Sequence, residues 1–414
     1  MFKSIQINKW RQFGEVDITF HDRLTILTGA NGSGKTTILN IFNSHFGWPI
    51  QFVGTPKQSS ITGDFKFFSD IWSSILDVEK ESVPKQHEIG KIVYRNGNIC
   101  AIHVPYFGSP IYNVGFSNLH HVRGFHIPSH RSLYKYQPIQ KIPSHLISRE
   151  FAFNQFNNSY MNRYLGNSSG PTDNYYIKES LISFATFGYG NKVIIKNDEA
   201  IKLFEGFEKI LKKVLPPKLG FQRFEIRMPE VVLVTTSGDF SLDAVSGGIA
   251  SIIDLAWRIF MFDDSLEPFT VTFDEPENHL HPEMQKTLLP NFLSAFPRTQ
   301  FIVATHNPFI ISSVSDSNVY ILNYNNSNRV VSMLLKDIEK SGSANDILRD
   351  ILGIETTMPD WVGVKLESII SKYTQTGITA VNLNSFKEEL KSIGLEKYVP
   401  TTIANLIEKT KKND

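Results

Sequence analysis

The run Gly29–Thr36, which reads GANGSGKT, constrains this chain more than any other feature. It matches the pattern G-x-x-x-x-G-K-[ST] at every fixed position. An apolar run, Leu24–Thr28, precedes it as a predicted strand, and residues 36–42 follow it as the start of a helix. In this strand–loop–helix context the pattern predicts a loop that cradles phosphate groups. Its glycines let backbone N–H groups converge on phosphate oxygens, and the helix N-terminus adds a favourable dipole.

Two side chains at the end of this loop have predicted roles of their own. Lys35 is expected to reach the β- and γ-phosphates, and the Thr36 hydroxyl is expected to ligate Mg²⁺. The predicted cofactors are therefore ATP and Mg²⁺. The predicted nucleotide contacts come from Gly29, Ala30, Asn31, Gly32, Ser33, Gly34, Lys35, Thr36 and Thr37.

Length and composition limit the class of protein. A chain of 414 residues predicts two or three lobes, and its formal net charge of +1 gives no global attraction to nucleic acid or membrane. Cys100 is the single cysteine, so no intrachain disulfide and no cysteine metal cluster can form. No run approaches 18 apolar residues. We therefore expect a cytoplasmic protein without membrane contact.

Four segments of the chain are predicted from its strand, helix and turn patterns. Residues 1–50 are expected to form the N-terminal part of a nucleotide-binding head. Residues 51–218 are expected to form an inserted lobe of antiparallel strands, an irregular basic and aromatic stretch, and helices. Residues 219–335 complete the head, and residues 336–414 are expected to be helical.

A pair of acids follows a second apolar strand, in the run Val271–Glu275. An acid at such a strand end can hold a Mg²⁺-bound water, the role predicted for Asp274, and Glu275 can act as general base toward the attacking water. His306 follows a third buried strand, 300–304, and its imidazole can hydrogen-bond the terminal phosphate or the water. We predict Glu275 and His306 as the catalytic residues.

Ser246, Gly247 and Gly248 open an apolar helix about 25 residues before the acid pair. A helix start of this kind offers backbone N–H groups, a hydroxyl and a positive dipole, the same chemistry as the first loop. We therefore predict a second phosphate contact at these three residues.

The four elements in this order resemble the ATP-binding-cassette (ABC) class of P-loop ATPases over residues 1–50 and 220–335. The resemblance implies an α/β fold: an ABC-type head with a mixed central sheet, an inserted irregular and helical lobe, and a small C-terminal helical region. It also implies a homo-oligomer of head-to-tail dimers, in which ATP lies between the Lys35 loop of one copy and Ser246–Gly248 of the other. The segment 245–249 reads VSGGI. Valine replaces the usual leucine and the usual final glutamine is absent, which leaves the backbone role intact.

The run from Asp274 to Pro282, DEPENHLHP, is more discriminating than the loop. It resembles the D-E-P-E-x-x-L-H-P pattern of AAA-type ABC ATPases in prokaryotic defence and overcoming-lysogenisation proteins. The segments IPSHR at 127–131 and GSANDILRDILG at 342–353 also resemble that branch. The opening, with WRQF at 10–13, is reminiscent of the ATPase subunit of the PARIS anti-phage system, and the Septu ATPase is a near alternative.

Two further features have open interpretations. His279 and His281 form an H-x-H pair that could chelate zinc with a third ligand. Their place in the family turn favours a dimer contact instead.

Residues 120–165 carry six cations against one acid, Glu150, with four interspersed tyrosines, which suits DNA or an acidic phage trigger protein. A solvent-exposed charged face balanced elsewhere explains the bias equally well, and Arg131 could instead serve the nucleotide site. The residues concerned are Arg123, Arg131, Lys135, Lys141, Arg149, Arg163, Tyr134, Tyr136, Tyr160 and Tyr164.

The leading functional prediction is an ATP-hydrolysing sensor in anti-phage defence that controls a separate nuclease effector, since no nuclease motif is visible in the sequence. The alternative is a RecF-like DNA-repair ATPase that acts directly on DNA. A transporter's ATPase subunit is disfavoured by the DEPENHLHP turn.

Overall fold

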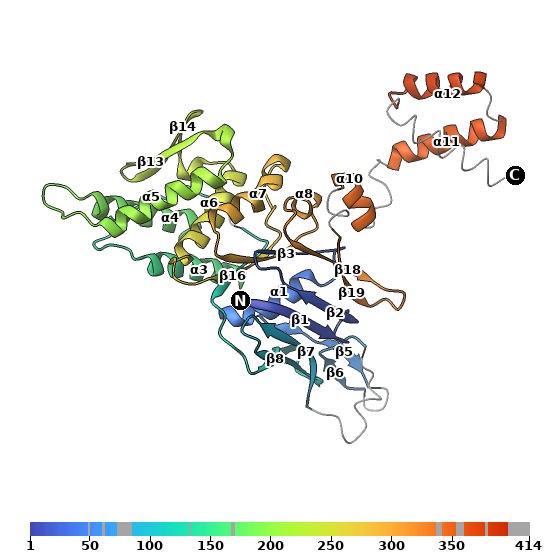
Figure 1. The fold of residues 1–414 in the computed structure, drawn as a ribbon, viewed down its shortest axis with the longest axis horizontal. Helices are drawn as coiled ribbons and strands as arrows, with labels where there is room; N and C mark the ends of the chain where they lie inside the picture. Colours follow the sequence, from blue (N-terminus) through green and yellow to red (C-terminus); the bar gives the residue numbers. More distant parts are fainter. Residues whose placement is uncertain are drawn as a thin grey trace. The chain divides into compact units, whose positions relative to one another are not determined.

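The computed structural model describes residues 1–48, 50–59, 63–72, 85–131, 134–166, 170–336, 342–352, 360–376 and 380–395. It contains two compact units, Met1–Ile347 and Leu348–Asp414 (Figure 1). The four predicted segments are not the same as these two units, and the finer division stays a prediction.

A six-stranded central sheet has the order β12-β16-β17-β3-β18-β19. Its first five strands are parallel, and β19 pairs antiparallel with β18. Every residue of β3, β16 and β17 is buried, as expected for parallel strands covered on both faces. The strands are β12 (Gly124–Ile127), β16 (Phe269–Asp274), β17 (Thr299–Ala304), β3 (Leu24–Thr28), β18 (Asn318–Tyr324) and β19 (Val330–Leu334).

A second sheet is antiparallel, with the order β11-β8-β7-β1-β2. Burial alternates along β2 and β8, which is the pattern of strands with one face on a core. Because β7 pairs with β1, part of the predicted inserted segment 51–218 belongs to the same sheet as the N-terminal strands. The strands are β1 (Phe2–Asn8), β2 (Glu15–Thr19), β7 (Gln86–Tyr94), β8 (Ile99–Pro105) and β11 (Gly115–Ser117). Two small sheets pair β4 (Phe52–Val53) with β10 (Ile111–Tyr112), and β5 (Thr55–Gln58) with β6 (Phe65–Phe68) and β9 (Phe107–Gly108).

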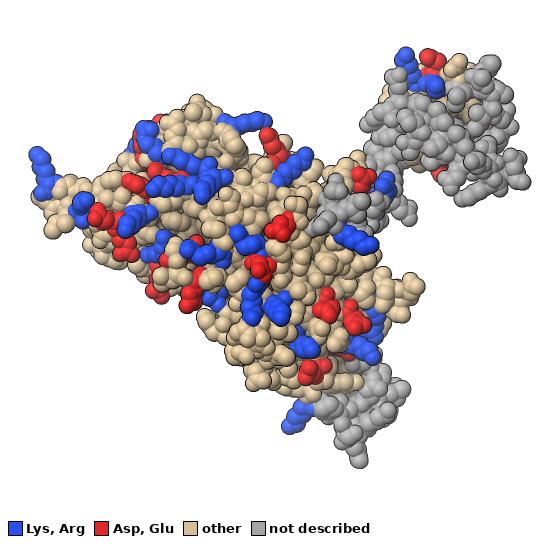
Figure 2. Space-filling view, viewed as in Figure 1, with Lys and Arg blue, Asp and Glu red and all other residues tan. Residues whose placement is uncertain are grey.

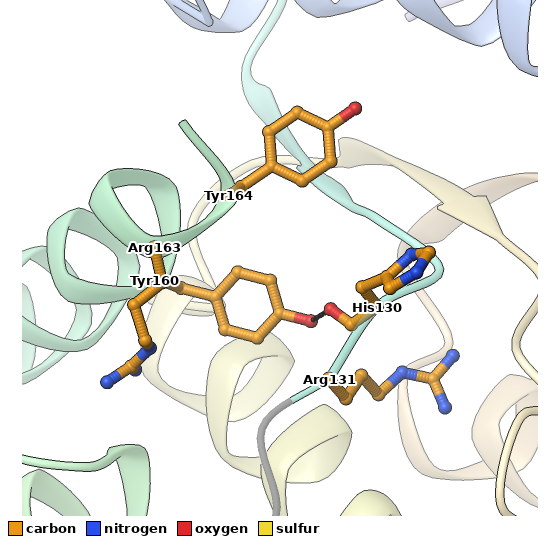
Figure 3. A pocket seen from close by; sticks show the side chains of 5 residues that line it. All are labelled: His130, Arg131, Tyr160, Arg163 and Tyr164. Atoms are coloured by element: carbon orange, nitrogen blue, oxygen red, sulfur yellow. Dashed lines mark hydrogen bonds between the residues drawn. The ribbon is translucent and has the colours of Figure 1, made fainter. Parts of the chain in front are cut away.

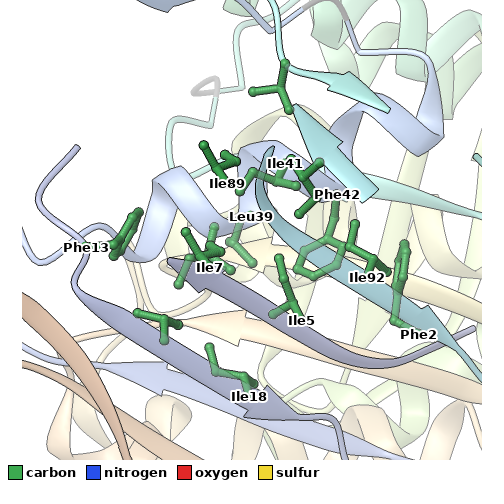
Figure 4. Close-up of a cluster of buried hydrophobic side chains, with 14 of the residues drawn as sticks. Phe2, Ile5, Ile7, Phe13, Ile18, Leu39, Ile41, Phe42, Ile89 and Ile92 are labelled. Carbon is green, nitrogen blue, oxygen red and sulfur yellow. The ribbon is translucent and has the colours of Figure 1, made fainter. Parts of the chain in front are cut away.

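The helix α1 (Lys35–Asn43) contributes to a core that the two larger sheets share. Phe42 projects from it toward the antiparallel sheet, where its ring centroid lies 4.5 Å from that of Phe2 and 5.3 Å from that of Phe20. Figure 4 shows Phe2 and Phe42 among isoleucines of β1 and β7. The same cluster includes Ile302 of β17, so the position of α1 is fixed from both sheets.

Helices and a three-stranded sheet make up the rest of the first unit (Figure 1). The amphipathic helix α5 has Asn197 as its N-cap, whose side chain accepts hydrogen bonds from the N–H groups of Glu199 and Ala200. The helices are α3 (Arg149–Tyr164), α4 (Asp173–Tyr189), α5 (Asp198–Val214), α6 (Gly247–Phe262), α7 (Pro282–Ala295), α8 (Pro308–Ile311) and α10 (Ala344–Asp346); the strands are β13 (Phe221–Arg227), β14 (Glu230–Thr235) and β15 (Gly238–Ser241).

The structure corrects one sequence expectation here. Within the inserted segment, residues 110–175 were predicted to have the least regular structure, but they contain α3 and the start of α4. Ser148 caps α3 by accepting the Phe151 N–H, and the buried Phe156 and Tyr160 hold the helix in place. Tertiary burial therefore outweighs the weak helix propensity of this Asn-rich segment.

In the second unit, α11 (Asp360–Thr376) and α12 (Ala380–Ser392) pack through an apolar cluster of their own. Leu366, Ile370, Phe386 and Leu390 are buried there. These helices agree with the predicted helical character of residues 336–414. Among the residues that the structure describes, no helix combines the length and the apolar character needed to cross a bilayer.

Replacing Phe42 tests whether the shared core fixes α1. We expect Phe42→Ala to lower the free energy of unfolding by about 4 kcal/mol, because it removes a large ring from a fully buried site. Ile195, which is 91% exposed, provides a control, and Ile195→Ala should cost less than about 0.5 kcal/mol. Urea unfolding followed by circular dichroism measures both, and equal losses would contradict this view of the core.

Candidate functional site

The loop after β3 has a backbone that only glycine fits at two positions. Gly29 has φ of 139°, and a Cβ there would lie 2.3 Å from the Leu322 carbonyl oxygen. Gly34 has φ of 97°, and a Cβ there would lie 2.4 Å from the Phe13 ring. No side chain caps the start of α1. The first N–H groups of this helix are therefore left to a ligand, as in helix-terminal phosphate sites.

Lys35 folds back over this loop. Its Nζ donates to the carbonyl oxygens of Gly29 at 2.9 Å and Ala30 at 3.1 Å. Burial lowers the pKa of Lys35, although the nearby carboxylates, Asp274 first, oppose that shift. Among the residues that the structure describes, the hydrogen-bond acceptors of this buried ammonium group are two neutral carbonyl oxygens, an arrangement that suits the entry of an anionic phosphate.

Thr36 and Asp274 meet although they are far apart in the sequence. The Thr36 hydroxyl donates to a carboxylate oxygen of Asp274 at 2.8 Å. Asp274 ends β16, and burial, reinforced by the charge of Glu275, raises its pKa to about 6. A hydroxyl beside one buried carboxylate suits Mg²⁺, which is bound by one or two protein oxygens and completes its coordination shell with water and phosphate oxygens.

The predicted catalytic pair also lies together. Nδ1 of His306 is 3.2 Å from one carboxylate oxygen of Glu275, and the other oxygen accepts the Asn278 side-chain N–H at 3.1 Å. The Glu275 N–H donates to the carbonyl oxygen of Ala304, which fixes this residue against the end of β17. His306 is half exposed, so the pair faces the open edge of the sheet.

Sequence reasoning missed the role of Glu277. This side chain is 5% exposed and accepts the hydroxyl hydrogen of Thr305, and burial raises its pKa. It joins the turn after β16 to the turn after β17. The repeated acids of the DEPE run were the available signal.

The structure places Ser246, Gly247 and Gly248 at the start of α6. Ser246 is the N-cap residue, and its hydroxyl accepts the Ile249 N–H at 3.5 Å. Ser246 and Gly247 are exposed. Their predicted contact with a nucleotide held by a second copy stays a prediction.

The histidine pair occupies the turn between β16 and α7. His281 caps α7, since its Nδ1 accepts the Glu283 N–H at 3.3 Å, and His279 has φ of 70°. No group of three metal-binding side chains is found among the residues that the structure describes.

Most of the cations in the basic segment have internal partners. Arg123 donates to the Phe262 and Glu267 carbonyl oxygens, each at 2.9 Å, and Arg149 donates to Phe260 and Asp263. Both therefore bind carbonyl oxygens at and beyond the C-terminal end of α6.

Arg163 pairs with the buried Asp173, and Arg131 binds the turn after β16. Lys135 and Lys141 are exposed. Figure 2 shows basic and acidic side chains mixed over the visible face. These four arginines therefore serve the fold and the site, which weakens their interpretation as a DNA surface.

A cavity of about 200 Å³ adjoins the turn after β16. Its lining residues come from the segment after β12 and from α3 (Figure 3). They are His130, Arg131, Tyr160, Arg163 and Tyr164. Arg131 lines this cavity and also donates to the Glu275 carbonyl oxygen, so the cavity lies close to the acid pair.

The family model described as "AAA domain, putative AbiEii toxin, Type IV TA system" matches residues 24–312, and a model of the "P-loop containing region of AAA domain" matches residues 2–44. The chain belongs to this AAA domain family. The matched range contains the loop, the acid pair and His306, in the order that the ABC resemblance requires.

Curated relatives of this AAA family protein include the "Retron Vc95 probable ATPase" of Vibrio cholerae serotype O1 biovar El Tor. It is 31% identical over 103 residues, which cover 23% of this chain and 20% of the relative. The "Septu protein PtuA" of Bacillus mycoides (strain KBAB4) is 27% identical over 48% of this chain and 29% of its own length.

PtuA of Bacillus thuringiensis is 18% identical over 86% of this chain and 85% of its own. The matches thus span about a fifth of the retron protein's length but most of the second PtuA. Among solved structures, the "SMC head domain from Thermotoga maritima" has a TM-score of 0.42 at 14% identity, covering 81% of this chain and 99% of that one. The PARIS resemblance stays a prediction.

Replacing Asp274 tests whether its buried carboxylate charge destabilises the nucleotide-free fold. The pKa of Asp274 is raised in the fold, so its contribution to stability is complete below the unfolded value of 3.8 and is lost as the pH rises through about 6. We expect Asp274→Asn to raise the unfolding free energy of the nucleotide-free protein by about 3 kcal/mol at about pH 8 and by roughly half that at about pH 5.

Urea unfolding at the two pH values measures this gain. Added Mg²⁺ and ATP should stabilise the wild type and leave the variant unaffected. A variant that is less stable than the wild type at both pH values would contradict the claim that the buried Asp274 charge destabilises the fold.

Proposed function

We propose that this protein binds Mg²⁺ and ATP and hydrolyses ATP as an ABC-type ATPase. One observation carries the proposal. The parallel strands β3, β16 and β17 end at the same edge of the central sheet, and the segments that follow them carry Lys35, Thr36, Asp274, Glu275 and His306. The AAA family match supports nucleotide binding.

Each residue has a role in this proposal. The loop N–H groups and Lys35 bind the phosphates, and Thr36 and Asp274 hold Mg²⁺. Glu275 orients and deprotonates the attacking water, and His306 hydrogen-bonds the γ-phosphate. The Glu275–His306 contact of 3.2 Å supports this division, because each side chain helps to orient the other.

A second copy completes the site in this proposal. Ser246 and Gly247 are exposed at the N-terminus of α6, a position suited to a phosphate held by a partner. To shift such a pair of copies from mostly open to mostly closed, the nucleotide must bind the closed dimer about 5.5 kcal/mol more favourably than the open form. Contacts from both copies to the γ-phosphate and Mg²⁺ are a reasonable source of this difference.

The proposed biological role is a sensor in anti-phage defence that controls a separate nuclease effector. The retron and Septu relatives support the defence setting, and the second PtuA match extends over most of both chains. Co-purification of a nuclease with the tagged protein would support this role. DNA-stimulated turnover in the absence of any such partner would favour the RecF-like alternative.

The dimer prediction is tested with Glu275→Gln. Removing the general base should block hydrolysis and leave the phosphate and Mg²⁺ contacts intact, so ATP should convert the variant from monomer to a larger assembly. Light scattering after gel filtration, with and without Mg²⁺ and ATP, measures the mass. Lys35→Ala in the same background is the control and should stay monomeric. If the variant binds ATP without any change of mass, the proposed dimer with ATP between its two copies is refuted.

A further inference from the structure

Arg131 occupies a place next to the acid pair that the topology explains. It lies four residues beyond β12, and β12 runs parallel to β16 with Ile127 opposite Phe273. The segment that leaves β12 therefore emerges beside the turn that leaves β16. The guanidinium carbon of Arg131 lies 5.4 Å from the centroid of the Phe273 ring.

The Arg131 guanidinium binds the backbone of that turn at three points. NH2 donates to the Glu275 carbonyl oxygen at 2.8 Å, and NH1 donates to the carbonyl oxygens of Pro276 at 3.1 Å and Asn278 at 3.2 Å. Arg131 is one of the residues that line the cavity of Figure 3, where its guanidinium group points away from that of Arg163. Its planar fork suits several acceptors at once, which a lysine ammonium cannot reproduce.

The turn needs such support because its backbone is strained. Glu275 has φ of 45° and His279 has φ of 70°, and neither residue is a glycine. Left-handed conformations of this kind are unfavourable for residues with a Cβ and persist only where the surroundings impose them. The conformation of Glu275 also sets where its carboxylate points.

Arg131 joins the same turn to α6. NH1 also donates to the Ser251 hydroxyl at 2.7 Å, and Ser251 lies one turn after Ser246–Gly248. On the other side, a Cβ at Gly248 would lie 3.0 Å from the His279 carbonyl oxygen, so the start of α6 touches the turn directly. One side chain thus links the backbone of the acid pair to the helix that carries the second phosphate motif.

We infer that Arg131 is a positioning residue that holds the Glu275 backbone against α6 and thereby aligns the Glu275 carboxylate for hydrolysis. The inference rests on the proposed ATPase function. Arg131 makes no contact with phosphate in this account, so nucleotide binding is expected to survive its loss.

The first experiment separates turnover from binding in the full chain. Arg131→Ala and Arg131→Lys should each lower kcat about 100-fold, the scale of a misplaced catalytic group, while KM for ATP changes less than about threefold. Arg123→Lys is the matched control, because Arg123 also binds backbone carbonyl oxygens and stacks on an aromatic ring, but at Phe262 and Glu267, at and beyond the far end of α6. Its kcat should stay within about twofold of the wild type.

Guanidinium ions provide a rescue test. Arg131 lines the cavity whose rim residues His130 and Tyr164 are exposed, so a small cation has a route to the vacated position. Guanidinium chloride at a non-denaturing concentration should raise the kcat of Arg131→Ala at least about tenfold, and the same concentration of sodium chloride should not raise it. A parallel loss of binding and turnover, or the absence of rescue, would overturn the positioning role.

Hydrogen exchange tests the inference independently of turnover. In Arg131→Ala, backbone exchange should rise in peptides that cover residues 274–284 and stay unchanged in those that cover residues 29–42. If the wild type shows no ATPase activity, the proposed function fails, and this exchange pattern alone decides the positioning role. Unchanged exchange in residues 274–284 would overturn it.

Discussion

The parallel pairing of β16, β17 and β3 determines where every residue of the site lies. In this register the strands end side by side, so Asp274, His306 and the glycine-rich loop meet at one edge although they are far apart in the sequence. The buried core shared with the antiparallel sheet holds α1 and therefore Thr36 within 2.8 Å of Asp274. The buried Asp274 carboxylate, whose pKa is raised, and the folded-back Lys35 are the charges that the proposed function assigns to Mg²⁺ and to the phosphates.

The arginines of residues 120–165 show how this protein uses positive charge. Arg123 and Arg149 satisfy carbonyl oxygens at the C-terminal end of α6, where helix termini need donors. Arg131 satisfies three carbonyl oxygens of the strained turn. A basic bias in the sequence therefore reflects internal hydrogen bonding here, and a surface for nucleic acid cannot be deduced from it. The two ends of α6 are held by arginines from one segment, which links this helix to the sheet edge that carries the acid pair.

The sequence was sufficient for the elements that have strong local signals. The strand Leu24–Thr28, the loop after it and the helix Pro282–Ala295 follow from apolar runs, glycines and prolines. It was insufficient for α3 and β12, whose structure depends on distant partners. The four-residue β12 is a strand because it pairs with β16, and α3 is a helix because Phe156 and Tyr160 are buried. Glu277 was missed as a site-supporting residue for the same reason, since its partner is a threonine that only the fold brings near. Arg131 was one of the residues considered for the nucleotide site, but its backbone partners in the turn after β16 could not be predicted from the sequence.

The central claim is that this sheet edge binds a magnesium-bound nucleoside triphosphate through Lys35, Thr36 and Asp274. Isothermal titration calorimetry of the purified chain with ATP, with and without Mg²⁺, tests it most directly. We expect saturable binding with Mg²⁺, markedly weaker binding in EDTA, and no measurable binding by Lys35→Ala. Absence of binding by the wild type, or equal affinity of the wild type and Lys35→Ala, would contradict the account.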